Sequence, residues 1–234
     1  MRTFKMYFYL FGYIATKLKL ISQAEQLIYQ GKQKEAYRLM DKTVEKGTRR
    51  ILKIAGARTT VRGLENISAN ETYLYVSNHQ SNMDIPLLFT IMPHKPTFIA
   101  KKEMGKIPLL NRVLKAKGCI LLDRENPRNA IKNINDGIKL LNSGVSVVLF
   151  PEGTRSKGPV MNEFKPGGLR LALKSGVKIV PVTIKDSYML LEHNNGKVTP
   201  ADVDITFSEP IDTSKYKDAV TLANDIQKVI QKNL

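Results

Sequence analysis

The stretch YLYVSNHQSNMD, residues 73–84, joins a short apolar run to a polar loop, and the rest of the chain is organised around it. Its first four residues are aromatic, aliphatic or β-branched and favour a buried strand, and an apolar segment begins directly after it at Ile85. His79 and Asp84 would lie about 140° apart on one continuous helix, so they cannot share a helical face. They can meet if His79 lies in the loop and Asp84 in the first turn of the next helix.

Spacing alone leaves two interpretations of this loop open. Ser81 is a good N-cap residue, Asp84 lies three residues on, and Pro86 is tolerated in a first turn. In the first interpretation Asp84 orients His79, and a neutral imidazole beside a carboxylate is a common device for taking a proton from an alcohol. In the second, Asp84 completes a capping box and His79 is an ordinary loop histidine. The chain has no serine-nucleophile elbow and no zinc-protease motif.

A second stretch, FPEGTRS at residues 150–156, follows another apolar run that begins at Val145. It opens a polar loop that carries a carboxylate, a glycine and a guanidinium. Together with the N-H-x-x-x-x-D spacing of residues 78–84, it closely resembles the motifs of the glycerolipid acyltransferase superfamily. Two further blocks follow the family's order, GCILLDR at residues 118–124 and IVPV at residues 179–182. The resemblance runs over residues 61–210.

The resemblance implies a reaction in which His79 is the general base. In this family the histidine takes a proton from the acceptor hydroxyl as that oxygen attacks an acyl thioester, and Asp84 would fix the ring tautomer and stabilise the imidazolium. The substrate is then the nucleophile, so no serine or cysteine elbow is needed. For the tetrahedral oxyanion, the candidate donors are backbone N–H groups at the helix start after His79 or at Gly153.

The resemblance also implies which residues bind the substrate. Arginine offers a planar fork suited to phosphate oxygens, so Arg124 and Arg155 are expected to contact the phosphate of the acceptor. Glu152 would repel phosphate, and we expect it to bind a glycerol hydroxyl or to orient Arg155. The other substrate-binding positions implied by the motifs are Lys101, Gly153, Thr154 and Lys165.

Within the family, the sequence E-G-T-R-S is more typical of enzymes that acylate lysophosphatidic acid, whereas relatives acting on glycerol 3-phosphate usually carry a second glycine where Thr154 stands. The expected function is transfer of a fatty acyl group from acyl-CoA or acyl-carrier protein to the sn-2 hydroxyl of lysophosphatidic acid, forming phosphatidic acid in phospholipid biosynthesis. Acylation of glycerol 3-phosphate or of another lysolipid is the alternative. We expect no metal and no cofactor, because no metal-ligand spacing links the histidines to the lone Cys119.

The charge of the chain favours an anionic partner. Its 234 residues suffice for one full core, and 37 basic against 21 acidic residues give a net charge of +16. The first 63 residues hold 14 of the basic and 4 of the acidic residues, so most of the excess lies outside the motifs. An anionic membrane surface or an acidic carrier protein would fit. A non-catalytic basic protein that binds membranes or nucleic acid is a remote alternative, because the chain has no zinc-finger, aromatic RNA-binding or clear helix-turn-helix pattern.

The N-terminus favours attachment to one leaflet of a membrane. The uncharged run at residues 6–16 is far shorter than the roughly 20 residues of a spanning helix, and no signal-peptide cleavage pattern follows it. We therefore expect an interfacial helix and a peripheral, monotopic enzyme on the cytoplasmic face of the cell membrane. A helix that only packs on the domain is the alternative. The apolar residues at helical spacing are Phe4, Phe8, Phe11, Ile14, Ala15 and Leu18.

The remaining chain alternates short apolar runs with helical patterns, which indicates an α/β fold. We expect a single mixed, mostly parallel sheet flanked by helices in residues 59–234. A membrane-interface motif of two antiparallel helices, residues 1–58, would precede it, the second helix following Gly31 and ending near Gly56. The expected strands are residues 73–76, 97–100, 119–122, 145–150, 179–184 and 204–207. The expected later helices are residues 108–118, 126–144, 168–175 and 216–232.

Overall fold

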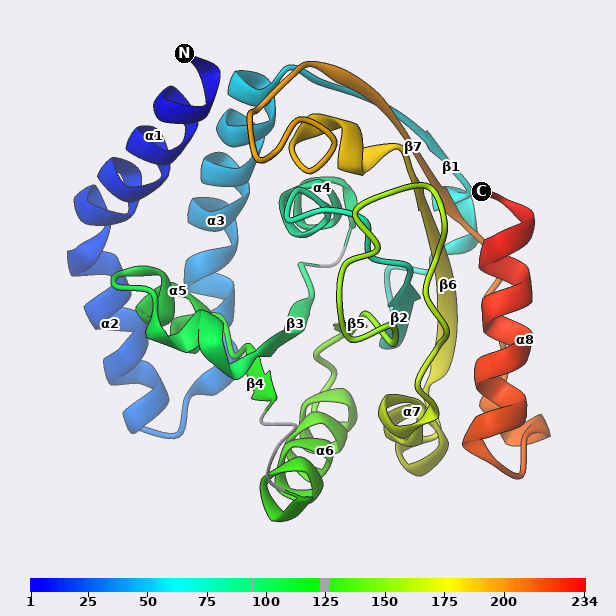
Figure 1. Ribbon diagram of the computed structural model, residues 1–234. Helices are drawn as coiled ribbons and strands as arrows, with labels where there is room; N and C mark the ends of the chain where they lie inside the picture. Colours follow the sequence, from blue (N-terminus) through cyan, green and yellow to red (C-terminus); the bar gives the residue numbers. More distant parts are fainter. Residues whose placement is uncertain (94, 123–126) are drawn as a thin grey trace.

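Strand β2, Tyr73–Ser77, is the central strand of a seven-stranded sheet in the computed structural model, which describes residues 1–93, 95–122 and 127–234 (Figure 1). The other strands are β1 Ala57–Arg62, β3 Thr97–Lys101, β4 Ile120–Leu122, β5 Val147–Leu149, β6 Lys178–Lys185 and β7 Ala201–Phe207. The strand order is β1-β7-β6-β2-β5-β3-β4. Neighbouring strands from β6 to β4 pair in parallel, whereas β7 runs antiparallel to β6 and parallel to β1. The sheet is therefore mixed and mostly parallel, as expected.

Helices cover both faces of this sheet, so β2 is buried along its whole length. Because side chains alternate across a strand, Tyr75 packs into one apolar cluster and Val76 into another. The cluster around Tyr75 includes residues of α3 and α4, and the cluster around Val76 includes residues of α6, α7 and α8. The helices are α1 Arg2–Thr16, α2 Leu18–Tyr29, α3 Gln33–Ala55, α4 Asp84–Ile91, α5 Leu110–Ala116, α6 Pro127–Asn142, α7 Arg170–Ser175 and α8 Ala219–Lys232.

The N-terminal helices form two arms that pack side by side (Figure 1). The first arm is divided at Lys17 into α1 and α2, and the second arm is α3, which ends at Gly56 with a φ of 79°. A left-handed residue after the last turn is a common helix stop, and glycine adopts it without a Cβ penalty. None of the helices in the described parts of the chain combines the length and apolar character of a membrane-crossing segment.

The expected apolar face of α1 is divided between two environments. Phe4 and Phe8 are 74% and 72% exposed, as an outward-facing patch requires. Ile14, in contrast, is buried, and Leu18 packs against the same cluster between the two arms, so both face inward. Helical spacing alone could not separate these sets, because the aromatic and aliphatic positions lie on adjoining sides of one helix.

Strand β1 was not expected from the sequence. It lies at the edge of the sheet, pairs with β7 alone among the described strands, and exposes most of its side chains. It therefore lacks the apolar run that marks the buried strands. The six expected strands are present with small shifts at their ends, and α4 begins at Asp84.

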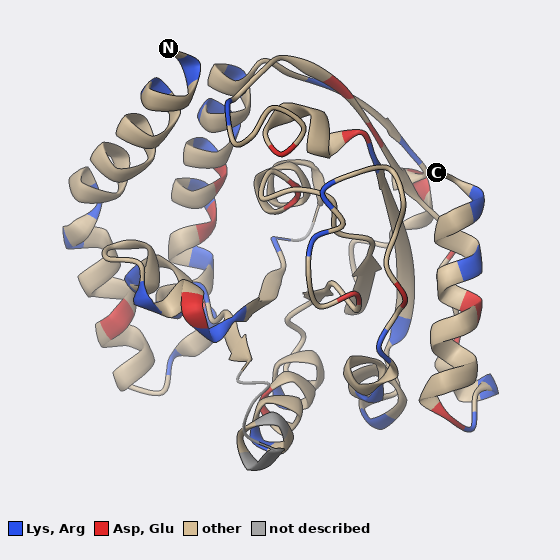
Figure 2. Cartoon of the chain, viewed as in Figure 1, with Lys and Arg blue, Asp and Glu red and all other residues tan. Residues whose placement is uncertain are grey.

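Basic residues are spread over several elements. Figure 2 shows lysines and arginines along α3 on one side of the molecule and along α8 on the other. The positive charge is thus not confined to the N-terminal arms.

Candidate active site

Strand register brings the two motif loops together. β2 and β5 pair in parallel with Val76 opposite Leu149, so His79 and Glu152 each lie three residues beyond this pair at the carboxyl edge of the sheet. The backbone N–H of His79 donates to Glu152 Oε1 at 2.6 Å. The N–H of Ser156 in turn donates to the carbonyl of His79 at 2.8 Å. Ligand sites of parallel α/β sheets lie at this edge, just outside the carboxyl ends of the strands.

His79 and Asp84 are in direct contact, with 2.7 Å between Nδ1 and Oδ2. Asp84 is completely buried, and the same Oδ2 accepts from the N–H groups of Gln80 at 2.8 Å and Ser81 at 2.9 Å. Its other oxygen accepts from the Ser187 hydroxyl at 2.5 Å. The contact expected in the first interpretation is therefore present. The capping box of the second is not formed as expected: Asp84 accepts from the Ser81 N–H, but α4 begins at Asp84 with Met83 as its N-cap and without a side-chain cap bond.

The imidazole of His79 is fixed in orientation and in tautomer. A carboxylate that already receives three other hydrogen bonds acts as acceptor, so Nδ1 carries the proton and Nε2 keeps its lone pair. The ring stacks on Phe150, with 4.1 Å between centroids and 19° between planes. The His79 side chain is 16% exposed, so the ring remains open to a ligand.

The residue before His79 locks the start of the loop. The Asn78 amide donates to the carbonyl of Ile184 and accepts from its N–H, both at 2.8 Å. This pair of bonds continues the pairing of β2 with β6 through a side chain. The loop therefore leaves the sheet at a fixed point, which sets the place of His79.

Glu152 holds two segments of backbone and does not contact Arg155. Its Oε1 accepts from His79, and its Oε2 accepts from the N–H and the side-chain amide of Asn162, both at 2.8 Å. The residue is 2% exposed, and burial raises the pKa of its carboxyl. Both oxygens of Glu152 thus accept from protein donors, whereas Arg155 pairs with Glu192, so the expectation that Glu152 orients Arg155 by direct contact is wrong. The alternative, that Glu152 binds a glycerol hydroxyl, stays a prediction.

The backbone N–H groups suggested for the oxyanion already have partners. After His79, those of Gln80 and Ser81 bond Asp84, and that of Asn82 bonds Glu192 Oε1 at 3.0 Å. The N–H groups that follow are also used, by Ser81 Oγ and by the Ser81 carbonyl. Gly153, with a φ of 75°, turns back so that its N–H donates to the Phe150 carbonyl at 3.1 Å.

Arg155 pairs with a residue that the motifs did not indicate. Its Nη1 donates to Glu192 Oε1 at 2.7 Å, and the Arg155 side chain is 30% exposed. Thr154 beside it is exposed. Lys101 ends β3 at the same edge of the sheet, and the Lys165 N–H donates to the Pro151 carbonyl at 3.0 Å; both residues are exposed.

Arg124 lies outside the described residues. Ser187, Asn162 and Glu192 were not found from the sequence. Each lies outside the two motif loops and reaches them through tertiary contacts. One signal was present for Ser187, which follows the apolar IVPV strand at the same edge as His79.

A family model described as Acyltransferase matches residues 58–185, from β1 to the end of β6. The chain belongs to this acyltransferase family. Among solved structures, the 1-acyl-sn-glycerophosphate (LPA) acyltransferase PlsC from Thermotoga maritima superposes with a TM-score of 0.76 and 27% identity, covering 100% of this chain and 96% of that one.

Curated relatives carry the same type of name. The chloroplastic 1-acyl-sn-glycerol-3-phosphate acyltransferase BAT2 of Brassica napus is 34% identical over 160 residues, which is 68% of this chain and 46% of that protein. The 1-acyl-sn-glycerol-3-phosphate acyltransferase of Borreliella burgdorferi is 37% identical over 132 residues, 56% of this chain and 52% of that protein. The chain thus spans about half the length of the curated relatives it matches.

A cavity of about 450 Å³ adjoins the site of this acyltransferase-family chain through Phe150 and Gly153. Aliphatic side chains from β3, β4, β5 and α6 line it, and three basic residues lie around it. The aliphatic residues are Ile99, Ile120, Leu122, Ile131, Ile134 and Leu149, and the basic residues are Lys165, Arg170 and Lys174.

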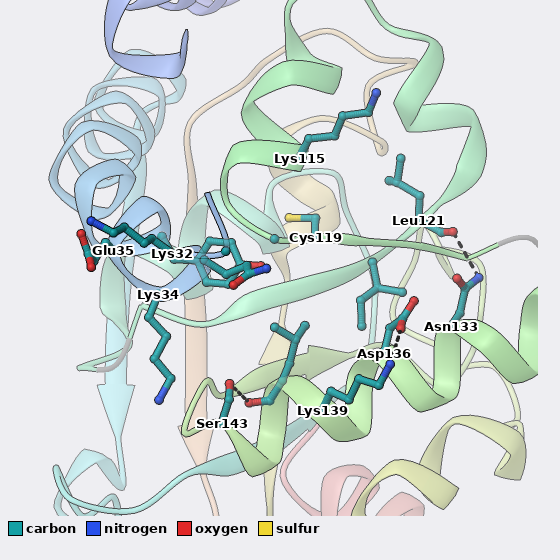
Figure 3. A pocket seen from close by; sticks show the side chains of 16 residues that line it. Lys32, Lys34, Glu35, Lys115, Cys119, Leu121, Asn133, Asp136, Lys139 and Ser143 are labelled. Carbon is teal, nitrogen blue, oxygen red and sulfur yellow. Dashed lines mark hydrogen bonds and ion pairs between the residues drawn. The ribbon is translucent and has the colours of Figure 1, made fainter. Parts of the chain in front are cut away.

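A larger cavity, about 870 Å³, is lined by the turn that precedes α3, the start of β4 and helix α6, and not by His79 or Asp84 (Figure 3). Its lining includes four lysines and two acidic residues. Asp136 pairs there with Lys139 at 3.7 Å, and Asn133 donates to the Leu121 carbonyl at 3.2 Å. Size alone does not select it as the reaction site, because it contains neither His79 nor Asp84.

Proposed function

We propose that this chain transfers a fatty acyl group from an acyl thioester to the sn-2 hydroxyl of lysophosphatidic acid, giving phosphatidic acid and a free thiol. The observation that carries the proposal is the buried Asp84 carboxylate 2.7 Å from His79 Nδ1. This pairing leaves Nε2 free to accept a proton from a hydroxyl. The names of the relatives support the choice of acceptor.

The proposed reaction needs no acyl-enzyme intermediate. As the sn-2 oxygen attacks the thioester carbonyl, its proton passes to His79 Nε2, and Asp84 stabilises the imidazolium that forms. The tetrahedral intermediate then expels the thiolate, which takes the proton from His79. The donor is acyl-CoA or acyl-carrier protein, and the basic surface favours either anionic molecule. The reaction draws on no metal or cofactor.

We assign the phosphate of the acceptor to Arg155, whose guanidinium has donors left after its bond to Glu192. Lys101 and Lys165 stand at the same edge of the sheet and add positive charge, and the family motif would add Arg124. The apolar cavity beside Phe150 suits an acyl chain, because aliphatic side chains line it. The basic residues around it suit the anionic groups of the substrates.

We also propose that residues 1–58 attach the enzyme to the cytoplasmic face of one membrane leaflet, as a peripheral, monotopic protein. Phe4, Phe8 and Tyr7 are 74%, 72% and 42% exposed and lie together on the outer side of α1. Apolar side chains on one face of a helix bury into the headgroup boundary, and lysines nearby attract anionic lipid. The lipid acceptor would then reach the site from the membrane.

Two substitutions test the proposed reaction. A general base contributes about 10²- to 10⁴-fold in rate, so we expect His79→Ala to lower turnover with lysophosphatidic acid and acyl-CoA by that factor. Asp84→Asn should fold, because Ser187 Oγ can accept from the new amide, but it should lose turnover since an amide does not stabilise the imidazolium. Turnover and thermal unfolding are measured for both.

The control is His193→Ala, which removes an exposed imidazole that contacts Tyr188 edge-on. It should retain wild-type turnover. Turnover of His79→Ala within about threefold of wild type would refute the base assignment. Parallel assays with glycerol 3-phosphate and other lysophospholipids identify the preferred acceptor.

A further inference from the structure

Glu192 is a buried carboxylate at the edge of the site, on the turn after the 3₁₀ helix η4, Ser187–Leu190. Its side chain is 6% exposed. Placing a carboxylate at this depth is costly unless charge and hydrogen bonds compensate it. The partners of Glu192 therefore indicate what the residue does.

One oxygen of Glu192 joins the two motif loops. Oε1 accepts from Arg155 Nη1 at 2.7 Å and from the Asn82 N–H at 3.0 Å. Asn82 lies between His79 and Asp84, so the cation assigned to phosphate is tied to the loop that carries the base. This bridge adds a link through the Arg155 side chain to the backbone bond between Ser156 and His79 that already joins the loops.

The pairing with Arg155 uses one oxygen, not both. Glu192 Oε2 is buried and has no hydrogen-bond partner among the described residues. A two-point pairing would satisfy that oxygen but would also occupy a second donor of the guanidinium. The observed geometry leaves Glu192 under-satisfied and keeps donors of Arg155 available for a ligand, and the Arg155 side chain is 30% exposed.

We infer that Glu192 is a positioning residue that holds Arg155 at a fixed distance from His79. It thereby favours acceptors in which a phosphate and the reacting hydroxyl are separated by that distance. The inference rests on the proposed function. Glu192 acts through Arg155 and is not itself a reacting group.

A double-mutant cycle with Glu192→Gln and Arg155→Ala tests the inference. Charge-assisted hydrogen bonds are among the strong ones, so we expect each single variant to raise the KM for lysophosphatidic acid about tenfold, with the KM for acyl-CoA changed by less than about twofold. In the Arg155→Ala background, Glu192→Gln should add less than about twofold. The preference for lysophosphatidic acid over monoacylglycerol, which lacks the phosphate, should fall by the same factor as the KM for lysophosphatidic acid rises.

Stability gives a second measurement that does not depend on activity. Arg155→Ala leaves Glu192 buried with Asn82 as its remaining donor, so the double variant should unfold at a higher temperature than Arg155→Ala alone. The control is Glu209→Gln, which neutralises an exposed carboxylate and should match wild type in every measurement.

Several outcomes would overturn the inference. These are additive effects on the KM for lysophosphatidic acid, an equal loss with monoacylglycerol, or a double variant no more stable than Arg155→Ala. If the wild type acylates none of the acceptors, the proposed function fails, and the unfolding temperatures still decide whether Glu192 and Arg155 act as a pair.

Discussion

At the scale of single residues, Glu152 shows how one side chain can hold together the two loops of a site. It receives the N–H of His79 on one oxygen and two donors of Asn162 on the other. A carboxylate can accept on both sides at once, whereas an amide accepts on one side and donates on the other. This chemistry explains why a buried glutamate, and not a glutamine, fits between the two loops.

We expect Glu152→Gln to lower turnover at neutral pH by about tenfold or more. The amide NH₂ of glutamine would face the N–H donors of His79 or Asn162, which it cannot accept from, and this would displace His79. Burial raises the pKa of Glu152, so the protonated carboxyl is favoured on folding. Its contribution to stability is therefore complete below about pH 4 and is lost as the pH rises through the raised pKa. Glutamine does not titrate, so the variant lacks this pH dependence. The difference in unfolding temperature between wild type and the variant should therefore become smaller from acid to neutral pH.

The matched control for this substitution is Glu163→Gln, an exposed carboxylate on the same loop. Its unfolding temperature should follow that of wild type at every pH. A difference between wild type and Glu152→Gln that grows with pH would contradict the sign of the pKa shift.

Residues of the site could be predicted from the sequence where their spacing is local. His79 and Asp84 are five residues apart, and their contact follows from a loop that leads into a helix. Ser187 lies 103 positions from Asp84, and no local pattern links such positions. Glu192 illustrates the same limit: the motif supplied Arg155, but its partner is chosen by the packing of η4 against the loops.

At the scale of elements, an ion pair with a buried lysine joins α3 to the end of α5. Lys117 is 4% exposed, and its Nζ lies 2.6 Å from Asp41 Oδ1 on α3. The same Nζ donates to the Lys95 carbonyl at 3.0 Å and lies 5.5 Å from the centre of the Phe89 ring. Asp41 supplies the counter-charge of this buried ammonium group, although its own side chain is 25% exposed.

We expect Asp41→Ala to lower the unfolding temperature by roughly 5 to 10 °C, because removing one partner of a buried pair leaves the other charge uncompensated. The control is Asp136→Ala, which breaks a pair in which Lys139 is 80% exposed. Exposed pairs contribute about 0 to 1 kcal/mol, so that variant should unfold close to wild type. Equal shifts in the two variants would show that the Lys117 pair contributes no more than a surface pair.

Helices and strands could be predicted from the sequence where their burial produces a recognisable apolar pattern. β2 is buried on both faces and reads as a continuous apolar run, whereas β1 is an edge strand whose exposed side chains carry no such mark. The break between α1 and α2 at Lys17 could not be predicted, because no glycine or proline marks it in the sequence.

At the scale of the whole molecule, the N-terminal arms share a core with the sheet. Met6, Ile51 and Leu52 belong to the same buried cluster as Tyr75. The hydroxyl of Thr3 also accepts from the Val198 N–H at 2.8 Å. Deleting residues 1–58 would therefore expose apolar surface of α4 and the sheet, so point substitutions are the better test of what α1 does.

The decisive substitution for membrane attachment is Phe8→Asp, since Phe8 is 72% exposed and stacks on Phe4 at 5.9 Å. Burying a phenylalanine side chain contributes about 1.5 to 3 kcal/mol, so we expect binding to vesicles of phosphatidylcholine and phosphatidylglycerol to weaken about tenfold or more. Turnover of acceptor dispersed in detergent should stay at the wild-type level, because α1 packs mainly against α2, α3 and α5 and Phe8 is exposed. Val220→Asp, on α8 and 56% exposed, adds the same charge to an apolar surface position and should bind vesicles as wild type does. Salt should weaken wild-type binding in part, since it screens the lysines but leaves the aromatic contact. Equal binding by Phe8→Asp and Val220→Asp would show that this face of α1 does not enter the membrane.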